Sequence, residues 1–182
     1  MAQIGLKNLY YAPLSKDDST GVTYGTPVKI AGLISVNISP SNSTSTLHAD
    51  DIPFAVASTL GEVSVTVEAA DIPLQAQAAL LGHTVSGNKM VCKGSDQAPY
   101  VAILFESDKH DGTTRYVKLL KGKFHDSNED LQTKGDSVEY QTPSIEGTFV
   151  CREYDGAWKE TADSASGTPI TDWYDSVESA GE

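Results

Sequence analysis

The sequence predicts a mainly antiparallel β body with one short α-helix, followed by a C-terminal tail. Residues alternate between apolar and polar in several segments, and pairs such as Asp111-Gly112 and Asp155-Gly156 provide turns between them. The alternation is clearest from Glu62 to Glu68, where three valines alternate with acidic and hydroxyl residues. Such a segment is typical of a strand with one buried face.

Further strands are expected along the whole body. Val28 to Ile38 is a period-two segment that precedes the valine strand. The remaining candidates are Tyr100 to Glu106, Arg115 to Phe124, Val138 to Gln141 and Ser144 to Arg152.

One helix is expected over Ile72 to Leu81, which is rich in Ala, Leu and Gln. Asp71 is its candidate N-cap, Pro73 falls in the first turn and Gly82 ends it.

A second apolar stripe lies in the tail, where Ile170, Trp173, Tyr174 and Val177 recur at helical spacing. Glu160 to Gly167 is interpreted as a flexible link before it. The chain is therefore divided into a β domain over residues 1–160 and a C-terminal extension over residues 161–182, with a short amphipathic helix in the extension.

Ser39 to Asp51 is a long polar segment between two strong strands. Connections longer than about 12 residues are uncommon in compact domains unless they have a function. We expect a functional inter-strand loop here.

Composition narrows the classes of function. The 182 residues include 25 acidic and 13 basic side chains, which gives a net charge of −12 and argues against a protein that grips nucleic acid. No apolar run approaches the roughly 20 residues that cross a bilayer, and the N-terminus has no secretory pattern. Cys92 and Cys151 are expected to stay reduced.

No catalytic motif or cofactor site is found in the sequence. Asp126, Asn128 and Asp130 match the first ligand positions of a calcium loop, but Leu131 and Ser137 replace its glycine and its final glutamate. The four histidines show no metal-ligand spacing. No enzyme activity, metal or cofactor is therefore expected.

Several blocks of the chain resemble the phi13-type major tail proteins of long-tailed bacteriophages. They are GLKNLYYAP, GEVSVTVEAADIPLQAQAALLGH and PYVAILFES, followed by DGTTRYVKLLKGKF and TKGDSVEYQTPSIEGTFV. The similarity extends in order from about Gly5 to Lys159.

This resemblance implies a tail tube protein with a β-sandwich and one flanking helix. Six copies would close into a ring whose inner sheets form one barrel, and stacked rings would form the tail through which DNA passes. The implied partners are the protein itself, the tape measure and other tail proteins. DNA would be met only in transit through an acidic lumen, without membrane binding. Assembly would take place in the host bacterial cytoplasm and the product would be part of the virion tail.

The resemblance also implies that the long loop reaches the adjacent ring. The segment Ser39 to Ala57 is expected to contact the neighbouring ring. The expected inter-ring residues within it are Ser39, Ser41, Asn42, Ser43, Thr44, Leu47, His48, Asp50, Asp51, Ile52 and Phe54. The polar side of the valine strand is expected to face the lumen, with Glu62, Ser64, Thr66 and Glu68. The tail stripe of Ile170, Trp173, Tyr174 and Val177 is expected to dock on a neighbouring subunit, with packing on its own domain as the alternative.

Other classes of protein stay open at this point. A tail terminator, a head–tail joining protein or a virion decoration protein would share the β-rich, acidic character but should not polymerise alone. An adhesin or carbohydrate-binding module should show clustered aromatic residues, whereas here the eight Tyr and two Trp are scattered.

Overall fold

In the computed structural model, which describes residues 2–49, 51–126, 132–133, 141–165 and 168–177, the body is built from antiparallel strands. The strands are β1 (Lys7–Asp18), β2 (Gly21–Tyr24), β3 (Val28–Ile30), β4 (Leu33–Ala49), β5 (Ile52–Ala69), β6 (Thr84–Ser86), β7 (Lys89–Val91), β8 (Val101–Asp108), β9 (Thr114–His125), β10 (Ser144–Phe149) and β11 (Lys159–Asp163). One helix, α1 (Leu74–Leu81), lies between β5 and β6 in the described residues.

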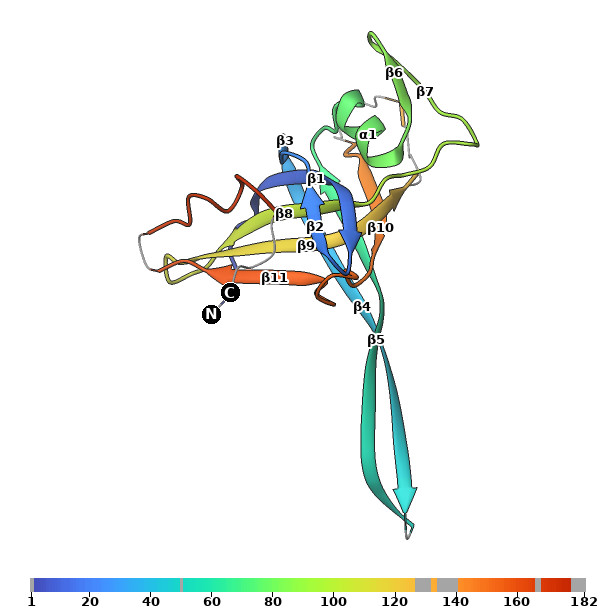
Figure 1. Cartoon of the computed structure of the whole chain (residues 1–182). Helices are drawn as coiled ribbons and strands as arrows, with labels where there is room; N and C mark the ends of the chain where they lie inside the picture. The colour runs from blue at the N-terminus through green and yellow to red at the C-terminus, as the bar shows by residue number, and fades with distance from the viewer. Residues whose placement is uncertain (1, 50, 127–131, 134–140, 166–167, 178–182) are drawn as a thin grey trace.

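Within the described residues, nine strands form one sheet, in which seven follow the order β2-β1-β8-β9-β10-β5-β4. β3 pairs with β1 and β11 pairs with β9 off this path, and β6 and β7 form a separate hairpin. Figure 1 shows β4 and β5 crossing the β8–β9 layer at a steep angle. The mainly β, antiparallel sandwich expected for the chain is therefore confirmed.

The main core lies between the two layers. Ile103 of β8 and Leu119 of β9 share it with Val65 of β5 and Phe149 of β10, and all four are almost fully buried. Helix α1 adds Ala76, Leu80 and Leu81 to the same cluster and thus packs against one end of it. Val63, Val65 and Val67 all belong to this cluster. The apolar face that the sequence predicted for this strand is therefore the face that packs in the main core.

The segment expected to be one strand from Val28 to Ile38 is two strands. Gly32 has a left-handed φ of 81°, and its carbonyl accepts the Ala70 N–H at 2.7 Å. β3 pairs with β1 before this point and β4 pairs with β5 after it, so the chain changes partner at Gly32. Val138 to Tyr140 of the candidate strand at Val138 to Gln141 lie outside the described residues.

The expected helix is confirmed with a shorter start. Pro73 is the N-cap, with ψ at 141°, and no side chain caps the first turn. Asp71 lies two residues too early to be the cap, so that prediction was wrong. Gly82 ends the helix in the left-handed conformation, as expected, and its N–H donates to the Ala78 carbonyl.

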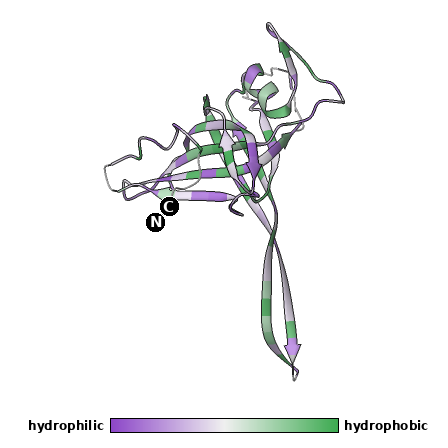
Figure 2. Ribbon diagram, viewed as in Figure 1, coloured by the Kyte–Doolittle hydropathy of each residue, from purple (hydrophilic) through white to green (hydrophobic). Residues whose placement is uncertain are grey.

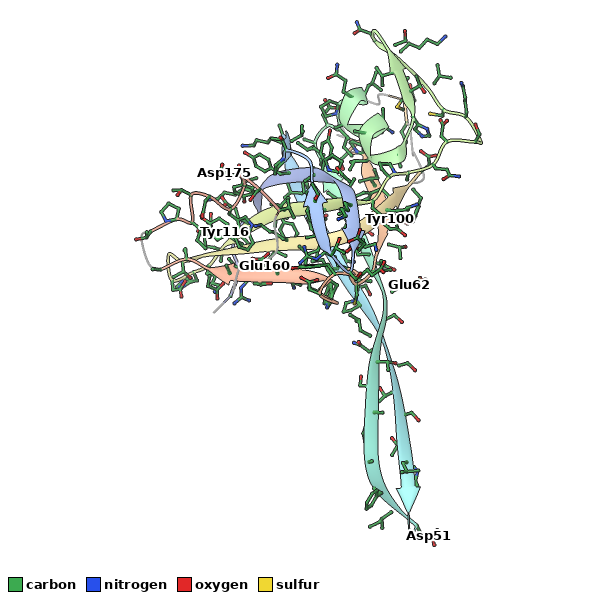
Figure 3. All side chains as sticks on the ribbon, viewed as in Figure 1. Asp51, Glu62, Tyr100, Tyr116, Glu160 and Asp175 are labelled. Carbon is green, nitrogen blue, oxygen red and sulfur yellow. The ribbon has the colours of Figure 1, made fainter. Side chains whose placement is uncertain are left out.

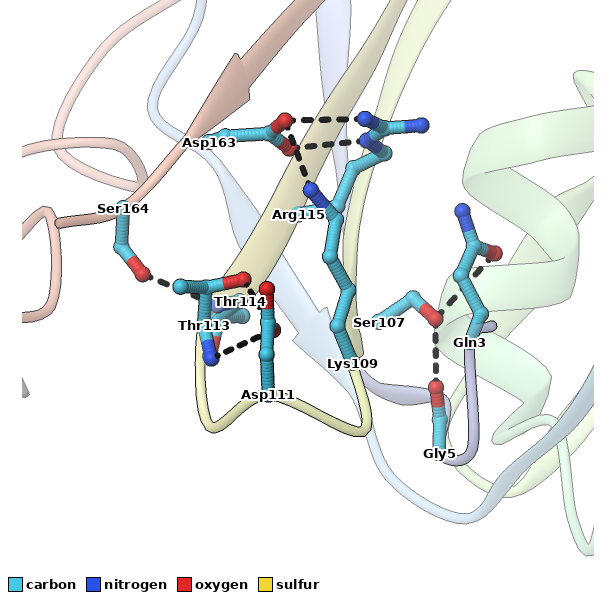
Figure 4. Close-up of polar contacts among 10 residues, drawn as sticks. All are labelled: Gln3, Gly5, Ser107, Lys109, Asp111, Thr113, Thr114, Arg115, Asp163 and Ser164. Carbon is cyan, nitrogen blue, oxygen red and sulfur yellow. Dashed lines mark hydrogen bonds and ion pairs between the residues drawn. The ribbon is translucent and has the colours of Figure 1, made fainter. Parts of the chain in front are cut away.

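The interpretation of Glu160 to Gly167 as a flexible link was wrong for its first residues. β11 pairs with β9 from Lys159↔Leu119 to Asp163↔Arg115. Side-chain contacts stabilise this polar strand (Figure 4). Arg115 Nε and Nη2 each donate to the Asp163 carboxylate at 2.8 Å, and Lys109 Nζ lies 2.6 Å from Asp163 Oδ2. The strand therefore crosses the boundary expected at residue 160.

The tail stripe does not form the expected helix. Thr171 to Asp175 are turns, and the Asp175 N–H donates to the Asp172 carbonyl at 3.1 Å. The apolar residues of the stripe instead pack in these turns against β1, β8 and β9.

Candidate assembly surfaces

A two-stranded hairpin leaves the body as a long arm. We define the arm as residues 41–60, the parts of β4 and β5 beyond the point where Val63 enters the core. Asp51 lies at its far end and Glu62 near its foot (Figure 3). The segment from Ser39 to Asp51, expected to be a loop, is therefore extended strand up to Ala49, paired with β5 except at two register shifts.

The arm carries uncovered apolar side chains. Leu47 is 61% exposed, Ile52 60%, Phe54 72% and Val56 66%. Ile52, Phe54 and Val56 occupy every second position of β5, and Figure 2 shows hydrophobic segments along this strand of the arm. A two-stranded ribbon has no second layer to cover such side chains, and a ribbon of this kind is marginally stable alone.

The arm is also almost uncharged. Between Ser41 and Leu60 the ionisable residues are His48, Asp50 and Asp51, all close to the tip. Burying an exposed side chain of the size of Phe54 or Val56 contributes about 1.5–3 kcal/mol. The arm thus has the chemistry of a surface that is buried in an assembly.

Most of the residues expected in the inter-ring loop lie on this arm. Ser41, Asn42, Ser43 and Thr44 are exposed on β4, and Leu47, His48, Asp51, Ile52 and Phe54 surround the tip. Ser39 differs, because it pairs with Ser64 in the body sheet, and Asp50 lies outside the described residues. Val56 belongs to the same apolar stripe, and its position in the alternating run Ile52-Phe54-Val56 is the signal that identifies it.

A polar face lies on the part of β5 that belongs to the body sheet, next to the foot of the arm. Glu62, Ser64, Thr66 and Glu68 lie on the side of β5 opposite its buried valines. Antiparallel pairing extends this face across β4 and β10, since Thr66 lies between Asn37 and Glu146 and Ser64 lies between Ser39 and Thr148.

The same face reaches β9, where Lys123 pairs with Thr148 and His125 pairs with Glu146. Sequence reasoning missed these two residues because the link between β9 and β5 depends on strand order. The face is therefore mixed in charge rather than uniformly acidic. Glu68 accepts hydrogen bonds from Thr142 and then Ser35, which hold the pKa of its carboxyl below the usual value.

The C-terminal strap, residues 168–177, covers the outer face of β1, β8 and β9. Trp173 and Val177 are buried there in a second cluster with Ala12, Ala102, Leu104, Tyr116 and Leu120. The Lys118 ammonium lies 4.1 Å from the centre of the Trp173 ring, and Tyr174 stacks on Tyr10. Ile170 is partly buried against the same cluster.

The four tail residues expected to touch a neighbour thus pack on their own domain in the single chain. This is the alternative that the sequence left open. A contact between the strap and another subunit stays a prediction. It would use either the surface of the strap that faces away from the sheet, or a strap that has moved off the sheet.

The described residues hold no group of three or more His, Cys, Asp or Glu arranged to bind a metal ion. Of the partial calcium loop, Asp126 is described, while Asn128, Asp130, Leu131 and Ser137 lie outside the described residues. No helix in the described part of the chain is long and apolar enough to span a membrane.

Comparison with known proteins gives one family. The model of the phage tail tube protein family matches residues 1–162 of the chain. No curated protein matches the chain. The match includes the arm, the polar face and β11 up to Ala162, whereas the strap lies beyond it.

Proposed function

The chain belongs to the phage tail tube protein family, and we propose that it polymerises as stacked hexameric rings that form the tube for DNA delivery. As a member of this family it is a structural protein of the virion tail. Its assembly in the host bacterial cytoplasm is part of the proposal.

The arm is the observation that supports stacking. It presents the apolar side chains of Leu47, Ile52, Phe54 and Val56 to solvent, which costs free energy until another surface covers them. A second copy of the chain supplies such a surface in every ring, and a head-to-tail contact of this kind repeats along the tube axis. The proposed inter-ring contact lies within the expected segment Ser39 to Ala57. It consists of the arm residues Ser41 to Thr44, Leu47, His48, Asp50 to Ile52, Phe54 and Val56, while Ser39 borders it in the body sheet.

The polar face is the surface that supports a lumen. Glu62, Ser64, Thr66 and Glu68 cannot contribute to a core, and a water-filled barrel requires polar residues on its inner side. Carboxylates repel phosphate, so DNA would pass with little adhesion. Lys123 on the same face moderates this repulsion.

The free edges of the sheet support lateral closure. In the described residues β4 ends the sheet on one side and β2 on the other. An exposed strand edge invites pairing with another strand, and a closed ring removes that hazard. The tape measure and other tail proteins would then meet the assembled tube, without any cofactor, enzyme activity or membrane contact.

A shortened arm tests the proposal. Residues 44–58 are replaced with Asn-Gly, which keeps the Ser43↔Thr59 pair next to a two-residue hairpin turn. Electron microscopy of concentrated wild-type protein should show rings or tubes, whereas the variant should stay folded and form no tubes. Normal tubes from the shortened variant would contradict the role of the arm, and a wild-type chain that stays monomeric at every concentration would contradict the proposed function.

A further inference from the structure

A small lobe, residues 82–98, leaves the body after α1 and returns to it before β8. It contains the β6–β7 hairpin and lies at the end of the molecule opposite the tip of the arm (Figure 1). The lobe closes tightly at its base, because a Cβ on Gly82 would stand 2.2 Å from the Gln97 carbonyl oxygen.

His83 lies in this base and bonds to two carboxylates from different parts of the chain. Its Nδ1 is 2.9 Å from Asp96 Oδ2 on the returning segment of the lobe. Its Nε2 is 3.3 Å from Asp126 Oδ1, directly after β9. The imidazole is 5% exposed, so water offers it little alternative hydrogen bonding.

The two carboxylates that contact the His83 ring can both accept a hydrogen bond only in one protonation state of the imidazole. A neutral imidazole has one N–H and one lone pair, whereas an imidazolium donates from both nitrogens. With neutral His83 donating to Asp96, the lone pair on Nε2 would face the negative Asp126 oxygen. Only a charged His83 can donate to both carboxylates at once.

The other groups around this site act mainly on its carboxylates. The pKa of Asp96 is lowered most by the bond from His83, then by the Lys93 N–H, and less by the charge on the Lys93 side chain. Helix α1 carries no charged residue, since its sequence is LQAQAALL. On the lobe, the Lys93 backbone N–H also donates to Asp96 Oδ2, and on the sheet the His125 ring approaches the Asp126 carbonyl at 3.3 Å. The bond to Asp96 raises the pKa of His83 most, burial opposes it, and Asp126 raises it further.

We propose that His83 is a charged clamp that fixes the lobe to the end of β9 and releases that contact when it loses its proton. Gly82 and Gln97 keep the base of the lobe closed in both states, so release loosens the lobe without unfolding the body. The stabilising contribution is complete at pH values below the usual histidine pKa and is lost as pH rises through the higher pKa of His83 in the folded chain. This inference does not depend on tube formation.

Histidine C2 hydrogen–deuterium exchange measured by mass spectrometry tests it on the full-length chain. We expect the pKa of His83 to lie above the usual histidine value. Asp126→Asn should lower it by roughly one pH unit, the effect of removing one nearby opposite charge. His110→Gln is the matched control and should leave it unchanged.

Amide exchange of the lobe gives the second readout. Peptides covering residues 84–97 should exchange about tenfold faster, after correction for the intrinsic pH dependence, once His83 is neutral. His83→Gln should show this faster exchange at every pH, while β8 peptides stay protected. The clamp is contradicted if the measured pKa of His83 is the usual histidine value, or if the corrected exchange of the lobe is the same at pH 5 and pH 9.

Discussion

The Tyr174 hydroxyl donates to Glu106 Oε2 at 3.0 Å and thereby fastens the C-terminal strap to β8. Glu106 is only 6% exposed, and its other oxygen accepts from Asn8 at 2.8 Å. Asn8 itself has a left-handed φ of 55° where the pairing of β1 shifts register. These two bonds therefore join segments near both ends of the chain to the one buried carboxylate of Glu106.

Removing this hydroxyl should weaken the strap. Tyr174→Phe keeps the stacking on Tyr10 but leaves a buried carboxylate oxygen without its donor. We expect a loss of about 1.5–3 kcal/mol in the free energy of unfolding, measured by urea denaturation. Tyr154→Phe, at an exposed position, is the control and should change little. Equal stability of the two variants would contradict this role of the bond.

Polar substitutions on the arm should block stacking without unfolding the body. Phe54→Ser combined with Val56→Ser removes apolar surface that is already exposed in the single chain, so its urea midpoint should stay near wild type. Tube yield by electron microscopy and sedimentation should fall at least tenfold, since about 1.4 kcal/mol per contact corresponds to a factor of ten. Thr59→Ser, on the same strand, should assemble normally. Full assembly of the double variant would show that the stripe is not the contact.

A side chain at Gly82 should destabilise the fold. Gly82 has a φ of 78°, and the obstructing atom is a backbone carbonyl that cannot rotate away. The left-handed conformation alone costs an alanine about 1–2 kcal/mol, and the overlap adds to it. Gly94→Ala, where a Cβ would meet nothing within 4 Å, is the matched control. Thermal unfolding of the two variants should differ by several degrees.

Acid should remove the contribution of Asp17. Burial opposes its ionisation, but the Glu153 N–H, Lys121 and the Tyr154 N–H together hold its pKa below the usual value. A depressed pKa stabilises the fold above about pH 4 and less as pH falls below it. Asp17→Asn should therefore cost about 1–3 kcal/mol at pH 7, with the difference from wild type shrinking towards pH 2. A pH-independent difference would contradict the ionised role of Asp17.

The parts of the fold that were predictable are those with a buried face. Val63, Val65 and Val67 alternate with polar residues because a core lies on one side of β5 only. β8 was predictable as a short apolar run, because both of its faces are buried, with Ile103 in the main core and Leu104 in the second cluster. The arm lacks this signal, since both of its faces are exposed and its serines and threonines are stabilised by pairing alone. β11 was missed because Arg115 and Lys109, distant in sequence, provide the partners of Asp163.

The sequence predicted which segments carry the candidate surfaces, but not all of the residues that lie on them. Alternation sufficed to place Glu62, Ser64, Thr66 and Glu68 on one face, but Lys123 and His125 join it only through strand order. The tail stripe was compatible with a helix, but its conformation depends on packing against Tyr116 and Leu120, which are distant in sequence. The pairing of His83 with Asp126 spans 43 positions and left no local pattern.

β5 runs as one strand from the tip of the arm into the core, and it carries both Val56 and Val65. A force on the tip is therefore transmitted along the paired ribbon towards the sheet, except where the pairing is irregular. The compliant points are the two irregularities of the ribbon, between Pro40 and Asn42 and between Leu47 and His48. The resistance of a filament of such subunits to curvature would then be governed by these two short stretches, and lengthening either of them should soften it.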